Sequence, residues 1–378
     1  MTAESSKWQN FLFWYSIVGM TIEKNYDLKK LNTLSVSARA KLFVEIKSEE
    51  DLRALFLTSE FKENNKFFLG GGSNVLFTKD FNGIVVKVSI LGKKVLEESE
   101  ESVLLEVNAG ENWHDFVTYA VEKNWGGIEN LAFIPGLVGA APIQNIAAYG
   151  ENFSDVFISL DAFNVESGEV EVFDKEKCGF GYRESIFKRE LKGKYIILRV
   201  RMKLSKIPKL ETSYYQIGIV RDGVKQELEK ISKGPYSIKD VYQAVINIRT
   251  RKLPDPKKIP TAGSFFLNSI VSKEKYEELK KKVPELQCYP PDQVAYKKLN
   301  DPALAKEDFV KVATGRLLEN LGWLGKWDGN VGVHDKHALV IVTNGEASGA
   351  EILKFSELIK KSYLENYGIP LEAEVNLI

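Results

Sequence analysis

The chain of 378 residues is long enough for two or three domains, and its hydrophobic fraction of 44% is enough to form buried cores. Lysine plus arginine and aspartate plus glutamate each number 52, so the formal net charge is zero and no overall field favours nucleic acid or an anionic membrane. The two cysteines and three histidines argue against a disulfide framework or a metal site and favour a reducing compartment. We expect a cytoplasmic monomer that binds small molecules, with no nucleic acid partner and no membrane insertion.

Residues 1–26 do not match the pattern of the rest of the chain. The apolar run FLFWYSIVGM at 11–20 is too short to cross a bilayer and lacks both a basic region before it and a small-residue cleavage site after it. We expect an N-terminal extension over 1–26, and Met20 is an alternative start of the protein.

Residues 27–205 predict an α+β domain with more strands than helices. Ser48 and the three acidic residues after it predict the start of a helix, because carboxylates stabilise a helix's first turn. A second helix at 112–126 has apolar residues at helical spacing and would end at Gly126. Alternation predicts a hairpin at 158–172 that turns at 166–169, and strands at 41–47, 66–70, 84–89, 103–110 and 195–204.

The polar, turn-rich segment 206–236 separates this domain from a second α+β domain at 237–378. Ser237 is a good N-cap for a helix over 238–252. Apolar periodicity predicts further helices at 272–282, 307–320 and 350–367, and strands at 337–343 and 371–378.

The stretch from Leu131 to Gly150, LAFIPGLVGAAPIQNIAAYG, contains no charged residue, although Glu129 and Glu151 flank it. Its two prolines interrupt any helix, and its glycines and alanines let the backbone approach another group closely. We interpret this uncharged stretch as a wall against which a flat ligand lies. An ordinary core loop is the alternative, although buried loops with so many backbone polar groups are uncommon.

Four further motifs indicate binding, and each has a structural alternative. The glycines of LGGGSNVL at 69–76 follow a strand and could present N–H groups to an anion or simply form a turn. Arg183 in FGYRES could meet a ligand carboxylate or pair with one of the protein's own. Ser264 in TAGSFFLN could be an exposed hydroxyl in a dry pocket beside two phenylalanines, or a cap. The basic RTRK at 249–252 could merely oppose a helix dipole.

Taken together, these motifs resemble those of UDP-N-acetylenolpyruvoylglucosamine reductase, the MurB family of peptidoglycan precursor synthesis. The matching blocks are LNTLSVSARA near Leu31, LGGGSNVL, IPGLVGAAPIQNIAAYG, CGFGYRESIFK and RTRKLPDPKKIPTAGSFFLN, and the HALVIVT and EAEV segments fit as well. The resemblance covers residues 27–378 in order. The region around Tyr214 is similar to the type I branch of the family, in which a tyrosine-bearing loop covers the substrate.

The resemblance implies an FAD-binding domain of the PCMH and vanillyl-alcohol oxidase type at 27–205, a substrate-covering loop at 206–236, and a C-terminal MurB substrate domain at 237–378. It also implies a reaction in which NADPH reduces FAD and hydride then passes to C3 of the enolpyruvyl group of UDP-N-acetylglucosamine enolpyruvate. A proton arrives at C2, and the product is UDP-N-acetylmuramate.

The family motifs also imply roles for individual residues. Arg183 resembles the arginine that meets the substrate carboxylate, Ser264 the serine that protonates C2, and Glu374 the glutamate that assists at the same centre. FAD is expected on the glycine turn and the uncharged stretch, at Gly70, Gly71, Gly72, Ser73, Asn74, Pro135, Gly136, Gly139, Ala140, Ala141, Gln144 and Asn145. Substrate is expected at Tyr149, Tyr214, Lys252, Asn268, Lys311 and His337, with the lysines near the diphosphate.

Three positions depart from the family pattern. Asn376 replaces the usual arginine, Leu324 replaces a lysine, and His337 stands where type I relatives often carry glutamine. A PCMH-type FAD oxidoreductase with another substrate and a non-catalytic flavin-binding module remain as alternatives. A generic flavin oxidase needs no proton donor such as Ser264, which favours the reductase.

Overall fold

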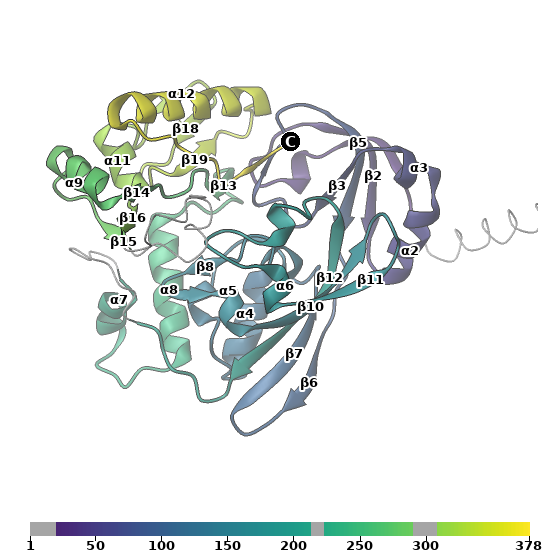
Figure 1. Cartoon of the computed structure of the whole chain (residues 1–378). Helices are drawn as coiled ribbons and strands as arrows, with labels where there is room; N and C mark the ends of the chain where they lie inside the picture. The colour runs from purple at the N-terminus through teal and green to yellow at the C-terminus, as the bar shows by residue number, and fades with distance from the viewer. Residues whose placement is uncertain (1–19, 213–222, 290–307) are drawn as a thin grey trace, which may run out of the picture.

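The computed structural model describes residues 20–212, 223–289 and 308–378, and Figure 1 shows how their elements are arranged. The first sheet has the order β1-β2-β5-β3, in which β2, β5 and β3 are parallel and β1 is antiparallel to β2. Its strands are β1 (Glu23–Asp27), β2 (Arg39–Ile46), β3 (Lys66–Leu69) and β5 (Phe81–Val88). Parallel strands need a crossover, which α2 (Glu49–Leu57) and α3 (Ser59–Glu63) provide between β2 and β3.

Helix α2 begins where the sequence predicts. The Ser48 hydroxyl accepts a hydrogen bond from the Asp51 N–H at 3.0 Å, and the Asp51 carboxylate accepts one from the Ser48 N–H at 3.1 Å. This capping box satisfies N–H groups that the first turn would otherwise leave unpaired.

The N-terminal extension is shorter than predicted. Strand β1 pairs with β2, and Met20 is buried in a core, so residues 20–26 belong to the fold. The rest of the predicted extension, residues 1–19, lies outside the described residues.

A second, antiparallel sheet of five strands has the order β11-β10-β12-β7-β6. Its strands are β6 (Lys93–Glu98), β7 (Ser102–Asn108), β10 (Phe157–Asn164), β11 (Val170–Asp174) and β12 (Tyr195–Ser205). The predicted hairpin is confirmed, because β10 pairs with β11 and Gly168 supplies a φ of +77° in the turn.

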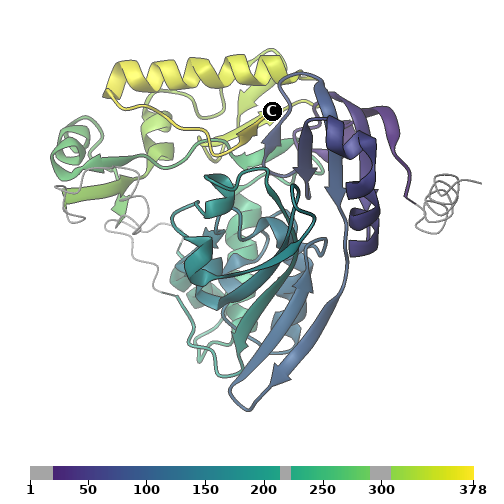
Figure 2. The same cartoon turned by 45° about the vertical axis from the view of Figure 1, so that its right-hand side comes forward.

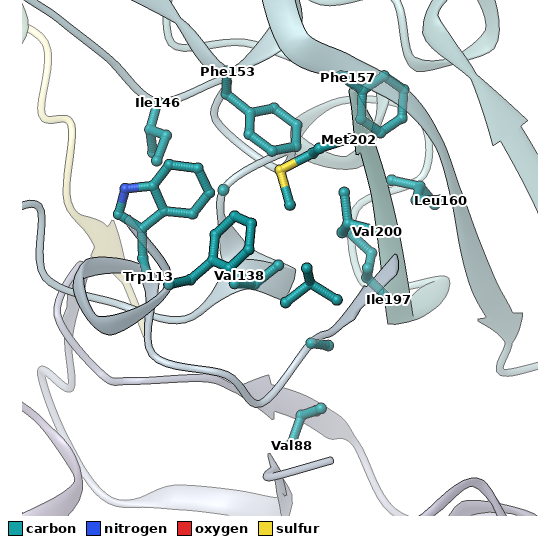
Figure 3. Close-up of a cluster of buried hydrophobic side chains, with 14 of the residues drawn as sticks. Val88, Trp113, Val138, Ile146, Phe153, Phe157, Leu160, Ile197, Val200 and Met202 are labelled. Atoms are coloured by element: carbon teal, nitrogen blue, oxygen red, sulfur yellow. The ribbon is translucent and has the colours of Figure 1, made fainter. Parts of the chain in front are cut away.

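The first core joins this sheet to helix α4 (Trp113–Glu122) and extends to the first sheet. Figure 3 labels Trp113 of α4, Met202 of β12 and Val88 of β5 among its side chains. Trp113, Phe153 and Met202 are buried in it, and the Trp113 indole N–H donates to the Leu131 carbonyl at 3.0 Å. The predicted apolar face of α4 is therefore confirmed. The helix ends at Glu122, earlier than predicted, because Asn124 already takes a left-handed φ of +60°.

The second core lies in the C-terminal half, beneath α12 (Gly349–Tyr367) at the top of Figure 1. One sheet has the order β13-β19-β18-β17, and a smaller one has the order β14-β16-β15. The elements are β13 (Thr261–Ser264), β14 (Ile270–Ser272), α9 (Lys273–Lys282), β15 (Cys288–Tyr289), β16 (Phe309–Val312), α11 (Thr314–Asn320), β17 (Trp327–Asp328), β18 (Val331–Val333) and β19 (Val340–Thr343).

The single helix predicted at 307–320 is wrong. Strand β16 occupies Phe309–Val312, and α11 begins only at Thr314. The FVKV segment contains two β-branched valines, which favour a strand once β14 and β15 are available on both sides.

The chain's end joins the two halves (Figure 2). Of the strand predicted at 371–378, only β20 (Asn376–Leu377) is regular, and it pairs in parallel with β4 (Val75–Leu76) of the N-terminal half. Further back, Ala373 bridges Phe266 of the C-terminal half. The segment is irregular because its backbone pairs with two different parts of the protein.

The Ser237 cap is confirmed, and helix α8 (Ile238–Lys252) follows it. The apolar face of α8 is buried in the first core, and α7 (Val224–Ile231) packs against the same helix. Residues 224–252 therefore pack with the N-terminal half. The covering-loop region at 206–236 and the domain start at 237 stay predictions.

Among the described residues, no helix is long and apolar enough to span a membrane, and no three His, Cys, Asp or Glu side chains gather as a metal site requires. Cys178 and Cys288 are buried free thiols. Burial raises the pKa of the Cys178 thiol to about 12, which makes it an unreactive core residue.

Candidate active site

The glycine turn and the uncharged stretch lie against each other. A Cβ on Gly71 would be 3.2 Å from the Gly136 Cα, and one on Gly70 would be 3.7 Å from the Leu137 side chain. The Ser73 hydroxyl donates to the Pro135 carbonyl at 3.2 Å. The two segments that the sequence assigns to one ligand are thus neighbours in space.

A cavity of about 580 Å³ opens beside this contact and is lined on one side by Gly70, Gly71, Gly110 and Leu137. Its remaining lining is mostly polar and includes Glu45, Lys47, Lys87 and Ser89. Lys87 and Ser89 both donate to the Glu45 carboxylate at 2.7 Å, so the feature of this cavity that fits a flavin is its backbone wall, which a flat ring can approach.

Some small residues of the uncharged stretch are required by core packing and do not face the cavity. A Cβ on Gly139 would lie 2.5 Å from the Ala109 Cβ, so packing against the core requires glycine there. The Asn145 side chain bonds inside the protein, donating to the Gly181 carbonyl at 3.1 Å and accepting from the Ser154 N–H at 3.0 Å. Contact of these two residues with FAD stays a prediction.

Asn74 connects the glycine turn to both halves. The Asn74 side-chain amide donates to the Gln144 side chain at 2.9 Å. The Asn74 backbone carbonyl accepts from the Asn376 side chain at 3.0 Å. Asn376, which departs from the family pattern, thus supports the glycine turn. Leu324, the other departure, is 39% exposed in the turn after α11.

The centre of the site is an ion pair between Arg183 and Glu374, whose Nε and Oε1 atoms are 3.2 Å apart. The Arg183 Nη2 also donates to the Ala147 carbonyl at 2.9 Å, within the uncharged stretch. The Lys188 ammonium donates to the Arg183 carbonyl at 2.8 Å. Both side chains of the pair are largely buried, with 22% and 14% exposed, so their charges interact with little screening by water.

Glu374 and Ser264 are brought together by backbone pairing. The Glu374 N–H donates to the carbonyl of Phe265, the residue after Ser264, at 2.8 Å. Phe265 and Phe266 are buried in the second core, and the expectation of a dry pocket around the Ser264 hydroxyl stays a prediction. Their packing fixes the end of β13, on which Ser264 lies.

Burial is the largest influence on the Glu374 carboxyl and raises its pKa above the ordinary value. The positive charges of Arg183 and Lys188 act in the opposite direction. The carboxyl therefore keeps its proton to a higher pH than an exposed glutamate does.

The basic end of α8 is divided between two tasks. The Arg249 Nε donates to the Phe133 carbonyl at 3.2 Å, and the pKa of Arg249 is lowered chiefly by burial, with Tyr149 opposing that effect. Arg251 points elsewhere and forms two bonds to Glu227, at 2.9 and 2.8 Å. The alternative that this cluster only opposes the helix dipole does not explain Arg249.

The predicted substrate residues lie around the same place. Burial and the positive charge of Lys252 lower the pKa of His337 to about 4, so this imidazole is neutral at pH 7. The Lys311 ammonium lies 4.2 Å from the ring centre of Tyr182, and the Arg183 guanidinium carbon lies 5.8 Å from the same ring.

The structure gives no support for a substrate contact at two of the predicted residues, Asn268 and Tyr214. The Asn268 side chain accepts from the Thr314 N–H at 3.2 Å, so it caps α11, and its contact with substrate stays a prediction. Tyr214 lies outside the described residues.

Backbone strain is concentrated here. Phe133, Asn145, Tyr149 and Arg183 all have positive φ, at 59°, 43°, 48° and 53°. Such conformations are unfavourable for non-glycine residues and persist where surrounding contacts impose them, which is common at functional sites.

Tyr182, Lys188 and Arg249 are site neighbours that sequence reasoning did not select. Arg249 had a detectable signal, because it lies three residues before Lys252 and so on the same helix face. Tyr182 and Lys188 become neighbours of the site only through the fold.

The fold and the site define a flavin-binding oxidoreductase with a separate C-terminal substrate domain. Residues 40–174 match the family model described as "FAD binding domain", and residues 255–378 match "UDP-N-acetylenolpyruvoylglucosamine reductase, C-terminal domain". The predicted fold class is thereby confirmed. The second match begins at residue 255, after α8, which agrees with the packing of α8 in the first core.

The chain belongs to the UDP-N-acetylenolpyruvoylglucosamine reductase family. It is 43% identical to the reductase of Flavobacterium johnsoniae and 41% identical to that of Amoebophilus asiaticus, covering 95% of this chain and 100% of each relative. A solved MurB structure from Thermus caldophilus has the same fold, with a TM-score of 0.61, 21% identity, and coverage of 95% of this chain and 99% of that one.

Proposed function

We propose that this protein is an FAD-dependent enzyme that uses NADPH to reduce UDP-N-acetylglucosamine enolpyruvate to UDP-N-acetylmuramate in peptidoglycan synthesis. The observation that carries the proposal is the buried Arg183–Glu374 pair, held next to the end of β13 where Ser264 lies. A cation, a hydroxyl and a carboxyl with a raised pKa are the groups that reduction of an enolpyruvyl ether requires from the protein.

Two segments that lie against each other support the proposed FAD site. The glycine turn and the exposed part of the uncharged stretch, with Lys87 and Ser89 nearby, would hold FAD. When bound, FAD supplies the two-electron chemistry, accepting hydride from NADPH and passing it to the enolpyruvyl double bond.

Arg183 would bind the substrate carboxylate. Negative charge spreads into that carboxylate as hydride adds to C3, and a guanidinium stays charged at any working pH. Its bond to the Ala147 carbonyl fixes the side chain beforehand, so little reorganisation is needed when charge develops.

Ser264 would deliver the proton to C2, and Glu374 would act at the same centre. A serine hydroxyl can rotate to aim its proton, and a protonated carboxyl can donate a hydrogen bond whereas a carboxylate cannot. Burial raises the pKa of Glu374, which makes the protonated form easier to reach than in an exposed glutamate, while the positive charge of Arg183 favours the carboxylate.

The remaining predicted residues would bind the rest of the substrate. Lys252 and Lys311 supply positive charge for the diphosphate. The Nδ1 of neutral His337 accepts from the Leu339 N–H at 3.3 Å, which leaves its Nε2–H to donate one hydrogen bond to the substrate. We place the reaction in the cytoplasm, with a monomeric enzyme. The packing supports a flavin domain that includes α7 and α8 and a substrate domain that begins near residue 255.

Anaerobic titration with NADPH tests the proposal. Protein purified with bound FAD should be yellow and lose its flavin absorbance as NADPH is added, since reduction abolishes the oxidised flavin spectrum. A fully loaded protein that NADPH does not bleach would refute the proposal and support a flavin-binding module instead.

A further inference from the structure

The two charges that flank the uncharged stretch are both buried. Glu129 has no exposed surface, and Glu151 is only 9% exposed. The Glu129 Oε2 accepts from the N–H groups of Gly127 at 2.6 Å and Ile128 at 3.1 Å, while its Oε1 has no hydrogen-bond partner among the described residues. Burying a charged group without full hydrogen bonding costs free energy, so the burial of both carboxyls, one of them with an unpaired oxygen, calls for a structural or functional explanation.

Asn130 links these carboxyls to the site. The Glu151 carboxylate accepts from the Asn130 N–H at 3.0 Å. The Asn130 side-chain amide then donates twice, to the Tyr149 carbonyl at 2.8 Å and to the Glu211 carbonyl at 2.8 Å. One fully buried asparagine thus holds the end of the uncharged stretch and the segment that leads toward Tyr214.

The turn held in this way is strained. Strands β8 (Ala147–Ala148) and β9 (Glu151–Asn152) form a small hairpin, and Tyr149 and Gly150 between them have φ values of 48° and 93°. Tyrosine does not adopt this conformation readily, so contacts must impose it. In this conformation the Tyr149 side chain interacts with Arg249, and the Ala147 carbonyl accepts a hydrogen bond from Arg183.

We propose that Glu129, Asn130 and Glu151 form a buried positioning unit, and that the hydrogen bonds of Asn130 to Glu151 and to the Tyr149 carbonyl hold the Tyr149 turn in its substrate-binding conformation. The proposal rests on the proposed function for the identity of the substrate. None of the three residues need touch the reacting atoms, and all act through the Tyr149 backbone.

The charges around the unit favour the bound proton. Burial, and then the negative charge of Glu129, raise the pKa of Glu151 to about 8, and burial raises that of Glu129 as well. Asp155 and Glu211 add further negative charge near Glu151. Two helices packed against this segment contribute one basic residue each. Arg249 of α8 donates to the Phe133 carbonyl, and His114 of α4 accepts from the Phe133 N–H.

A pH comparison of wild type with Glu151→Gln tests the proposal. A pKa raised from 4.5 to about 8 means that the folded protein holds this proton more tightly than the unfolded chain, so wild-type stability falls as pH rises through that window. Glutamine keeps the shape and removes the titration. Between pH 6 and 9 the wild-type Tm should fall by on the order of 5 °C more than that of the variant, measured without substrate.

The second measurement is the KM for the enolpyruvyl substrate. From pH 7 to 9 it should rise about tenfold more in wild type than in Glu151→Gln, because an ionised carboxyl is costly to keep buried and its rearrangement disturbs the Asn130 bonds that hold the Tyr149 turn. Glu129→Gln removes the other charge and should act in the same direction if Glu151→Gln fails to fold. Glu122→Gln, at an exposed position, should titrate like wild type.

Equal pH dependence of Tm and KM in wild type and in the Gln variants would overturn the proposal, as would a raised KM with no change in pH dependence. Failure of the wild-type protein to be bleached by NADPH would instead refute the proposed function, and the substrate-free Tm comparison would still stand.

Discussion

Replacing Ser264 by alanine should slow reoxidation of the reduced enzyme by the enolpyruvyl substrate by about 10³-fold, within the range that a general acid contributes. Reduction of the flavin by NADPH should stay near the wild-type rate, because that step needs no proton at C2. The two half-reactions can be followed separately by stopped-flow absorbance under anaerobic conditions. Alanine fits the extended backbone of β13, so folding should not be affected.

Two controls make the Ser264 experiment specific. Ser264→Cys retains a proton donor and should recover part of the lost rate. Ser59→Ala, at an exposed position in α3, should leave both half-reactions unchanged. If Ser264→Ala slowed both half-reactions equally, the residue would be needed for the site's structure and would not be the specific proton donor.

Arg183→Lys should lower the rate of the second half-reaction by about 10²- to 10³-fold, the usual loss when a charge-stabilising donor is removed. Lysine keeps the positive charge next to Glu374 but cannot also bond to the Ala147 carbonyl and present a planar fork to a carboxylate. The loss should appear both in the KM for the enolpyruvyl substrate and in the hydride-transfer rate, while NADPH oxidation is little affected.

Arg251→Lys is the matched control, because Arg251 also binds a carboxylate through two nitrogens but faces away from the site. The Arg251 guanidinium is the main reason that the pKa of Glu227 is lowered to about 2. This control should reduce the free energy of unfolding by about 1 kcal/mol and leave both half-reactions intact. A full-speed second half-reaction in Arg183→Lys would contradict the assigned role of Arg183.

Local signals in the sequence predict much of the N-terminal half and the centre of the site. Ser48 and Ser237 cap helices where their side chains can reach the N3 N–H groups, which is a property of adjacent residues alone. The glycine turn and the uncharged stretch, which the family resemblance assigns to one ligand, lie against each other. Arg183 and Glu374 are paired, as two residues serving one centre should be.

Long-range packing decides what the sequence does not reveal. Strand β16 exists because β14 and β15 lie on both sides of it, whereas the local pattern resembles a helix. Helix α8 sits in the first core although a turn-rich segment precedes it. Glu129 and Glu151 look like solvent-exposed ends of an apolar run, and only the folded hairpin buries them together.

Anaerobic mixing of the NADPH-reduced protein with UDP-N-acetylglucosamine enolpyruvate tests the central claim most directly. We predict that the oxidised flavin absorbance returns in a single turnover and that one UDP-N-acetylmuramate forms for each flavin reoxidised. A flavin that stays reduced with this substrate, yet reoxidises when oxygen is admitted, would contradict the account.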